Sequence, residues 1–345
     1  MMSNQRTVYF DVLRILASFA IIVVHVSAQN WDSTDIISFE WKVFTVFNGV
    51  ARWGVPVFVM ISGALFLERD LSYGVIFRKY ILHRLIAYLV WSCVYVLEAC
   101  AKNQNVDIIY QILTGRTHMW FLPMIMGLYL TIPFMRLIVQ KEKLTAAFLI
   151  IAFVTAISVP QFLSTARLIS GSSIIKALER IKNSTNLSFF GGFSVYFILG
   201  NYMRRRDIAW WLICIAGIIG FTVTPFGTLW LSRCLGTQNE AFYSNFSVNV
   251  FLESVFVFAI VKKLMEQIEI SERIKQLVAF FSKCSFGAYL VHILVIDLLR
   301  DVAGLNSLTY SPVLSVIVIS SLVIVLSYTV SIVLNRIPLI GRYIV

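Results

Sequence analysis

Long apolar runs separated by short polar segments dominate this chain. A membrane-spanning helix needs about 20 predominantly apolar residues, and ten runs are long enough to qualify. They cover residues 9–29, 43–67, 80–101, 119–139, 144–163, 188–203, 207–224, 247–265, 278–299 and 311–334. A spanning segment that has no sheet to join satisfies its backbone hydrogen bonds by forming a helix. The pattern predicts an all-α polytopic membrane protein with about ten transmembrane helices.

The polar segments between these runs leave no room for a soluble domain. The longest connections, 164–187 and 225–246, are too short and too polar to enclose a core of their own. The runs at 188–203 and 207–224 are short, so a bent pair is the alternative to two spans there. No inverted halves and no period of 20–50 residues are visible. We therefore expect residues 1–345 to form a single membrane-embedded domain.

Composition and charge agree with a membrane location. Of the 345 residues, 59% are hydrophobic and 14% are charged, and the mean hydropathy is +0.81. The 29 Lys and Arg exceed the 18 Asp and Glu, but this excess does not indicate nucleic-acid binding. With the N-terminus in the cytoplasm, 18 basic residues fall in inner segments and ten in outer ones, and the triplet Arg204–Arg206 is the strongest marker. The charge bias predicts that both termini are cytoplasmic.

Cysteine and histidine spacing does not predict a metal site or a disulfide framework. The five cysteines (93, 100, 214, 234 and 284) are scattered, mostly in apolar runs, so we expect core packing. The four histidines are far apart and include no ligand-spaced pair, so we expect no metal. The first apolar run contains Asp11 and Arg14 and lacks a small-residue cleavage site, so we expect no cleavable signal peptide.

The first predicted span carries ionisable residues along one face. Arg14 and His25 are eleven residues apart, which returns to within about 20° of the same direction after three turns. Asp11 and Ser18 lie within roughly 40° of that line. Charged residues inside a span are costly and usually mark function. The alternative interpretation is structural: His25 bonds to a neighbouring helix, and Asp11 simply pairs with Arg14.

The length of this polar face suggests a long ligand. Arg14 and His25 are separated by about 16 Å along the helix axis, so they cannot contact one atom but can hold two ends of one molecule. An anionic ligand whose reactive end lies far from its charge has that shape, and acyl-coenzyme A is an example. Because histidine exchanges a proton near neutral pH, the sequence predicts a reaction centre at His25, beside a central polar cavity.

Five segments in chain order carry a family resemblance. They are Asp11-Val-Leu-Arg14 with His25 after ten more residues, Trp53-Gly-Val-Pro56 leading to Ser62-Gly63, Phe77-Arg78-Lys79 leading to His83-Arg84, His118-Met-Trp120 leading to Gly127-Leu-Tyr129, and Ser285-Phe-Gly287-Ala-Tyr289-Leu-Val-His292. Together they resemble the membrane-bound acyltransferase 3 family. The chain is most similar to its short surface-polysaccharide O-acetyltransferases, such as that for enterobacterial common antigen. His83 and Ala87 depart from the pattern, where relatives often have Arg and Pro.

The resemblance implies an acetyl-CoA-dependent O-acetyltransferase of a bacterial plasma (inner) membrane. Acetyl-CoA, or another acyl-CoA, would be a co-substrate and no cofactor would stay bound. The acceptor would be a hydroxyl of a lipid-linked or exported surface polysaccharide, and the lipid bilayer would be the other partner. The expected site residues are His25, Arg14 and Asp11 for catalysis, Ser18, Arg78, Lys79 and Arg84 for the donor, His118, Trp120 and Tyr129 for the acceptor, and His292 as a second site.

Each of these residues also has a structural interpretation. Arg78, Lys79 and Arg84 at a cytoplasmic helix start are common topology anchors, and Ser62-Gly63 also suits close helix packing. His118 and Trp120 also suit an interfacial aromatic belt, and His292 a structural hydrogen bond. Two other classes of protein share these features. A transporter or flippase uses a similar polar stripe, and a scaffold of a polysaccharide assembly would not depend on His25.

Overall fold

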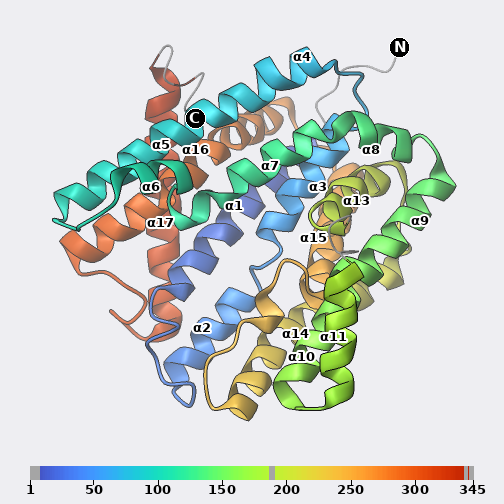
Figure 1. Ribbon diagram of the computed structural model, residues 1–345. Coiled ribbons are helices and arrows are strands. Elements are labelled where there is room, and N and C mark those ends of the chain that lie inside the picture. Colours follow the sequence, from blue (N-terminus) through green and yellow to red (C-terminus); the bar gives the residue numbers. More distant parts are fainter. Residues whose placement is uncertain (1–7, 186–190, 338–340, 342–345) are drawn as a thin grey trace.

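Helices make up all regular secondary structure in the part of the chain that the computed structural model describes, residues 8–185, 191–337 and 341 (Figure 1). The first half contains α1 (Val8–Ala28), α2 (Phe39–Gly49), α3 (Gly54–Phe66), α4 (Tyr73–Val75), the π-helix η1 (Ile76–Ile81), α5 (Leu82–Ala101), α6 (Ile108–Thr114), the 3-10 helix η2 (Thr117–Trp120), α7 (Phe121–Leu130), α8 (Ile132–Val139), α9 (Glu142–Ala152), the π-helix η3 (Phe153–Ser158) and α10 (Val159–Ile169). The second half contains α11 (Ser173–Thr185), α13 (Ser194–Arg205), α14 (Trp210–Leu235), the 3-10 helix η4 (Ala241–Tyr243), α15 (Val248–Gln267), α16 (Glu272–Ala303) and α17 (Pro312–Arg336).

Seven of the described helices or continuous helix pairs are long and apolar enough to cross a bilayer. They are Val8–Ala28, Phe39–Phe66, Tyr73–Ala101, Glu142–Ile169, Trp210–Leu235, Glu272–Ala303 and Pro312–Arg336. The pair Thr117–Leu130 and Ile132–Val139, bent by 61°, makes eight if it counts as one span. The chain is therefore a multi-pass membrane protein, as the apolar runs predict.

Two of the ten predicted runs do not qualify as apolar spans in the structure. The run at 188–203 becomes the 12-residue α13, and residues 186–190 lie outside the described part of the chain. The run at 247–265 becomes the 20-residue α15, which carries Glu253, Lys262 and Lys263. The run at 207–224 also starts later and ends later, as the 26-residue α14. Pro225 lies inside α14, so this proline does not end the helix there.

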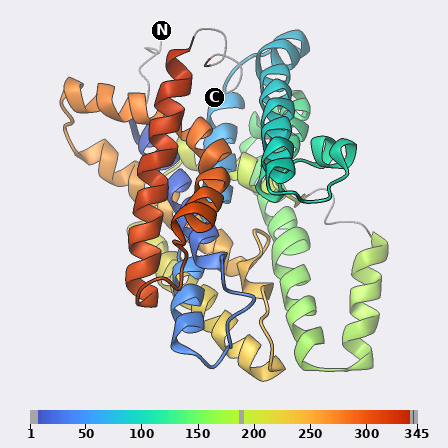
Figure 2. The ribbon, with the colours of Figure 1, turned by 90° about the vertical axis from the view of Figure 1, so that its left-hand side faces the viewer.

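α1 lies inside the bundle and contacts five other helices, α2, α3, α15, α16 and α17 (Figures 1 and 2). This central position explains why the polar residues of α1 face protein rather than lipid. Arg14 lies near the end of the bundle at which α1 begins, and His25 lies near the opposite end. We call these two ends the Arg14 end and the His25 end.

The predicted second span is broken rather than continuous. It begins at Phe39 instead of 43, α2 ends at Gly49, and α3 starts at Gly54. A Cβ at Gly54 would lie 3.0 Å from the carbonyl oxygen of Ala17, so glycine allows the start of α3 to approach α1 closely. Residues 50–53 connect α2 and α3 within the segment Phe39–Phe66 as a turn with backbone hydrogen bonds that run three residues back. A continuous apolar run does not by itself reveal such a break.

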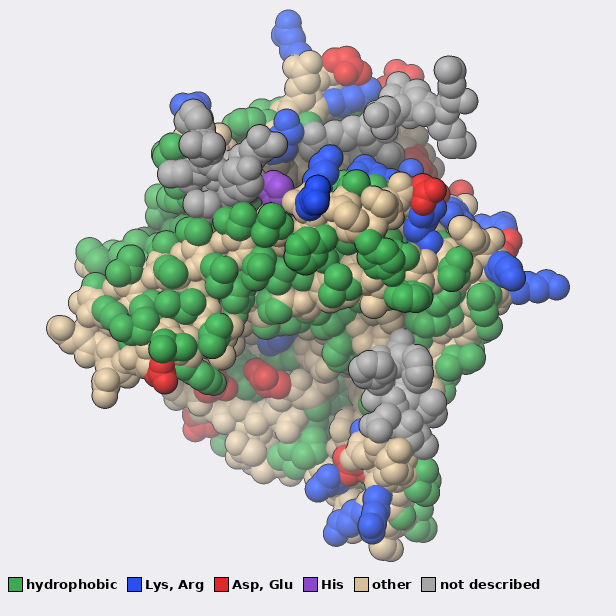
Figure 3. All heavy atoms as spheres, turned by 45° about the horizontal axis from the view of Figure 1, so that its top comes forward, with side chains coloured by type: hydrophobic (Ala, Val, Ile, Leu, Met, Phe, Trp, Pro, Cys, Tyr) green, Lys and Arg blue, Asp and Glu red, His purple; other side chains and the backbone are tan. Residues whose placement is uncertain are grey.

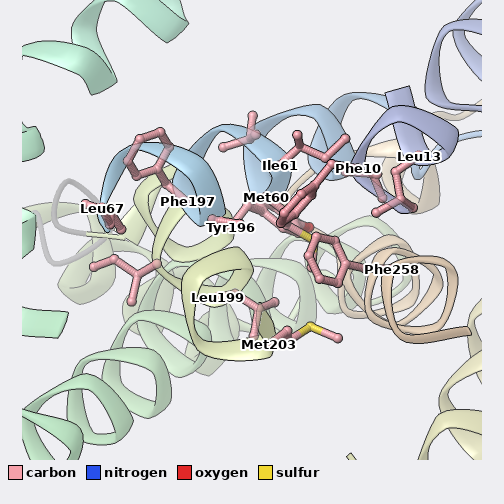
Figure 4. Packing of buried hydrophobic residues seen from close by; sticks show 14 of the residues in the cluster. Phe10, Leu13, Met60, Ile61, Leu67, Tyr196, Phe197, Leu199, Met203 and Phe258 are labelled. Carbon is pink, nitrogen blue, oxygen red and sulfur yellow. The ribbon is translucent and has the colours of Figure 1, made fainter. Parts of the chain in front are cut away.

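Glycines bring α3 and α13 unusually close together, within the apolar core shown in Figure 4. A Cβ built on Gly63 would lie 1.7 Å from the carbonyl oxygen of Phe197. A Cβ on Gly200 would lie 1.9 Å from the carbonyl oxygen of Met60. Small residues at helix interfaces are typical of membrane proteins. The packing interpretation of Gly63 is therefore confirmed.

A broad belt of apolar side chains crosses the face of the molecule in Figure 3, with Lys and Arg along its upper edge and a further group below it. This arrangement explains which cysteines are exposed. The prediction of core packing is right for Cys284, which is buried, and wrong for Cys93, Cys100 and Cys234, which are exposed. A spanning helix is apolar on its lipid-facing side as well as its core side, so an apolar run does not tell the two apart.

Candidate active site

The Arg14 end holds an acidic anchor for Arg14. The Asp11 carboxylate lies 3.2 Å from Nη1 of Arg14, one helical turn away. Ser282 of α16 donates a hydrogen bond of 2.6 Å to the same carboxylate oxygen. Asp11 is buried, whereas Arg14 is partly exposed. Asp11 therefore ties α1 to α16 and orients the Arg14 guanidinium.

A cavity of about 380 Å³ opens beside Arg14. It lies among α1, α3, η1, α5, α7 and α16, and we call it the basic cavity. Its basic lining residues are Arg14, Arg69, Arg84 and Lys283, and its other lining residues are Ile21, Phe58, Ser62, Leu65, Phe66, Tyr80, Phe121, Ile125, Tyr129, Ser282, Ser285, Phe286 and Tyr289.

The charge of the basic cavity suits an anionic ligand. None of the described residues that line it is an Asp or Glu. The Arg84 guanidinium lies over the Phe286 ring, 4.1 Å from its centre, which fixes one cation at the wall. Arg69 and Lys283 are exposed at the surface. Clustered guanidinium groups bind phosphates well because they can form paired hydrogen bonds.

Three histidines meet at the His25 end, and we call them the histidine cluster. The His292 ring centre lies 5.0 Å from that of His25 and 5.0 Å from that of His118. The His25 and His118 ring centres are 6.4 Å apart. His118 and His292 are buried, whereas His25 keeps partial exposure. Residues from α1, η2 and α16 thus converge on one place, although they are far apart in the sequence.

Hydrogen bonding fixes the proton on His292. Its Nδ1 lies 2.5 Å from the backbone carbonyl oxygen of Tyr289. A carbonyl oxygen only accepts, so in the neutral ring Nδ1 carries the hydrogen and Nε2 carries the lone pair. That Nε2 is buried and has no hydrogen-bond partner among the described residues. His292 therefore presents an unused acceptor within the histidine cluster.

Neighbouring side chains hold His118 in place. The Tyr289 hydroxyl donates a hydrogen bond to the backbone carbonyl of His118. The Tyr95 ring packs edge-on to the His118 ring, with the two centres 5.3 Å apart. Two residues before His118, Arg116 makes a 2.8 Å ion pair with Asp297 of α16. The loop that carries His118 is thus tied to the helix that carries His292.

Aromatic side chains lie between the basic cavity and the histidine cluster. Phe58, Phe121 and Tyr289 line the cavity, with ring centres 6.2 Å apart for Phe58 and Phe121 and 5.8 Å apart for Phe121 and Tyr289. The Tyr289 ring centre is also 5.6 Å from that of His118. The three histidines do not line the cavity, and Tyr289 borders both the cavity and the histidine cluster. We call Phe58, Phe121 and Tyr289 the aromatic layer.

The structure separates the predicted donor residues into three groups. Arg84 lines the basic cavity. Arg78 and Lys79 are exposed and line a shallow neighbouring hollow that shares Tyr80 and Arg84 with the cavity. Ser18 does not line the cavity, because its hydroxyl lies 2.6 Å from the Tyr328 hydroxyl and bonds back to Ile15. Helix periodicity predicts that Ser18 shares a face with Arg14, but it could not show that Tyr328 of α17 contacts Ser18.

The predicted acceptor residues do not lie together either. His118 joins the histidine cluster, but the exposed Trp120 packs against Phe193, with ring centres 5.5 Å apart. Tyr129 lines the basic cavity and stacks on Phe66, with ring centres 4.6 Å apart. Tyr129 therefore lies apart from His118, because the face of α7 formed by residues 121, 125 and 129 lines the basic cavity. Its predicted role in acceptor binding stays a prediction.

Other site residues were not predicted from the sequence. Arg69 and Lys283 line the basic cavity, but from the sequence they count only as inner topology charges. Ser282 donates a hydrogen bond to Asp11, a contact between α16 and α1 that helix periodicity alone does not predict. Tyr289 could have been found from the sequence, because it stands three residues before His292 and so shares a helix face with it.

We find no metal-binding arrangement of three or more His, Cys, Asp or Glu side chains among the residues that the structure describes. The histidine cluster thus brings together proton-exchanging groups that are not arranged as ligands.

Sequence comparison places this site in a known family. The family model described as an acyltransferase domain, acyltransferase 3, matches residues 7–335, which is nearly the whole chain. The chain belongs to the acyltransferase 3 family. Membership supports an acyltransferase that works in a membrane and uses an acyl donor and an acceptor. A search of curated proteins and a search of solved structures each found no match.

Proposed function

We propose that this protein transfers an acetyl group from acetyl-CoA to a hydroxyl of a lipid-linked or exported surface glycan. The observation that carries the proposal is the placement of the basic cavity and the histidine cluster at opposite ends of α1. A long anionic thioester needs a cationic site for its phosphates and a separate site for its reactive carbon. The length of α1 provides that separation.

The donor enters at the Arg14 end in this proposal. Arg14, Arg84, Arg69 and Lys283 bind the phosphates of coenzyme A, and the pantetheine arm runs through the basic cavity. Asp11 keeps the Arg14 guanidinium oriented. Arg78 and Lys79 add positive charge at the entrance, because their hollow adjoins the cavity. The aromatic layer of Phe58, Phe121 and Tyr289 then has to open for the acetyl group to reach His25.

The reaction takes place at the histidine cluster in this proposal. His25 removes the proton of the acceptor hydroxyl as its oxygen attacks the thioester carbonyl carbon. A carbon–oxygen bond forms, the carbon–sulfur bond breaks, and the coenzyme thiolate leaves and takes a proton. His292 and His118 are positioning residues that contact His25 and the incoming hydroxyl. The Nε2 lone pair of His292 can accept a hydrogen bond from either.

We infer that the enzyme lies in a bacterial plasma membrane with the Arg14 end in the cytoplasm, and the charge bias supports this orientation. Basic residues favour the cytoplasmic side. Arg204 and Arg205 form the last turn of α13 at the Arg14 end, and Arg206 follows it. Acetyl-CoA is a cytoplasmic metabolite, so the same orientation lets it enter beside Arg14. The acceptor then reaches the histidine cluster from the opposite side. Tags after residues 141 and 205 should therefore report the cytoplasm.

The experiment that tests the function measures the products directly. Purified protein in detergent is mixed with acetyl-CoA, and the release of free coenzyme A is followed with and without cell-surface glycan. In parallel, glycans from cells with and without the gene are compared by mass for the gain of one acetyl group. We expect both signals, and we expect His25→Ala to remove both. Abundant protein with neither signal would show that a transporter or scaffold is the better description.

A further inference from the structure

The break in the segment Phe39–Phe66 places a second cation near His25. Arg52 lies in the connection 50–53 between α2 and α3. Residues 50–53 form a turn with backbone hydrogen bonds three residues back, and such an interruption of a helix within the membrane is stable where protein buries it or where it lines a water-filled cavity. Discontinuous helices commonly form binding sites for this reason. The break is therefore a place where a functional side chain is expected.

Two hydrogen bonds link Arg52 to the turn of α1 that carries His25. The Arg52 Nε donates to Oδ1 of Asn48 at 2.6 Å. Asn48 in turn donates through Nδ2 to the backbone carbonyl oxygen of Val24 at 3.3 Å, one residue before His25. These two bonds fix Arg52 relative to the turn of α1 that carries His25. Arg14, in contrast, is about 16 Å from His25 along the helix axis.

Packing holds the Arg52 guanidinium without using its terminal nitrogens. Its central carbon lies over the Tyr243 ring, 4.2 Å from the ring centre. Glu253 is buried nearby and accepts a hydrogen bond from the Thr224 hydroxyl, but it makes no ion pair with Arg52. Among the described residues, no hydrogen bond or ion pair reaches Nη1 or Nη2 of Arg52, and the side chain remains partly accessible.

An oriented cation with unused donors is suited to a developing negative charge. When an oxygen adds to a thioester carbonyl, the carbonyl oxygen becomes an oxyanion. Hydrogen-bond donors that are fixed in advance stabilise this oxyanion most effectively. Arg52 has such donors, and Asn48 links it to the turn of α1 that carries the base that the same reaction needs.

We propose that Arg52 is a catalytic residue whose terminal guanidinium nitrogens donate hydrogen bonds to the thioester carbonyl oxygen during acyl transfer. The assignment rests on the proposed function. The acceptor oxygen bonds to the carbonyl carbon, its proton goes to His25, and the carbonyl π electrons move onto the oxygen that Arg52 holds. Collapse of this intermediate breaks the carbon–sulfur bond and releases the coenzyme thiolate, which is protonated. Asn48 is a positioning residue in this scheme.

The test exploits the fact that water can replace the glycan as acceptor. Wild type and Arg52→Gln are purified in detergent, and both acetyl-CoA hydrolysis and transfer to glycan are measured over a range of donor concentrations. We expect kcat for both reactions to fall by about 10²- to 10³-fold, with the KM for acetyl-CoA nearly unchanged. Arg233→Gln is the matched control, because Arg233 is an exposed arginine near the end of α14. It should leave both rates unchanged.

Folding is checked by the melting temperature and by size-exclusion chromatography of each variant. If Arg52→Gln does not fold, Arg52→Lys keeps a charge in the break but lacks the fork of donors. It should lower kcat for both reactions by roughly tenfold or more, since lysine replaces several fixed donors with one flexible group.

Three results would overturn the assignment. Loss of transfer with normal hydrolysis would mean that Arg52 binds the glycan instead of the oxyanion. A raised KM with normal kcat would mean a role in donor binding or structure, and normal kinetics would mean no role. If the wild type both hydrolyses and transfers and the variant gives any of these results, only the Arg52 assignment is wrong. A wild type that neither hydrolyses nor transfers removes the proposed function as well.

Discussion

The two ends of α1 differ in charge, exposure and rigidity. At the Arg14 end four cations surround an open cavity, and two of them are exposed. At the His25 end the clustered groups are imidazoles, two of which are buried. A charged ligand is bound most easily where its counter-charges stay hydrated, whereas proton transfer is best controlled where bulk water is excluded. In the proposed reaction one helix would serve both needs, because its ends lie in different surroundings.

The two ends are also held together differently. At the His25 end, Asp297 is paired with Arg116 and Arg300, each at 2.8 Å. Lys102 adds a 2.7 Å pair with Asp301, so α5, α16 and the loop before η2 are connected. At the Arg14 end, Glu68 connects α3 and α13 from a partly exposed position. We expect the reaction centre to be the more rigid of the two regions.

The largest effect should come from the reaction centre. His25→Gln keeps a hydrogen-bonding side chain but removes the base, so turnover should fall by roughly 10²-fold or more. Acetyl-CoA affinity should stay nearly unchanged, because the cations lie at the other end of α1. Calorimetry beside transfer rates measures both quantities. Arg233→Gln is the control, since Arg233 is exposed near the end of α14, outside both regions. Loss of donor binding in His25→Gln would contradict the division between the two ends.

Arg14 should give the opposite pattern. Arg14→Lys keeps the charge but loses the planar fork, so the apparent KM for acetyl-CoA should rise by about tenfold, in the range expected for a charge-assisted hydrogen bond. Turnover should change less. The same kinetic assay checks this prediction over a range of donor concentrations. If Arg14→Lys lowers only turnover, then Arg14 acts on the reaction centre and the comparison between the ends is wrong.

A smaller contrast should separate Arg84 from Arg78. Arg84 lines the basic cavity and packs on Phe286, whereas Arg78 is exposed in the shallow hollow. Arg84→Gln should weaken donor binding more than Arg78→Gln does. The effect of Arg78→Gln should also disappear in high salt, because exposed charges are screened. Donor affinity at low and high salt measures the difference. Equal losses in both variants would place coenzyme A outside the basic cavity.

The smallest effect concerns acid stability at the Arg14 end. Partial burial raises the pKa of Glu68, but hydrogen bonds from Arg205 and Asn201 and the nearby Arg charges outweigh this, so its pKa lies below the usual value. A carboxylate with a lowered pKa contributes stability above its unfolded pKa and loses it as the pH falls through the folded value. Glu68→Gln should therefore lower the melting temperature at pH 7, and the two proteins should converge below about pH 4. A constant difference across this range would contradict the assignment.

The broad architecture could be predicted from the sequence for a simple reason. Hydrophobic length is a local property, so the runs containing α1, α5, α16 and α17 were all located. The face shared by Arg14 and His25 also follows from helix geometry alone. The break at residues 50–53 could not be predicted, because Val50 and Ala51 fit an apolar run as well as they fit a connection.

Tertiary structure decided which residues share a site. The sequence alone determined a multi-pass helical membrane protein, the polar face of α1, and a resemblance that the family match confirms. It could not show that His25, His118 and His292 meet, because their proximity depends on how α1, η2 and α16 pack. It also could not show that Ser18 bonds to Tyr328 of α17, or that Tyr129 of α7 lines the basic cavity. Periodicity specifies directions around one helix, whereas a site depends on which other helices lie in those directions.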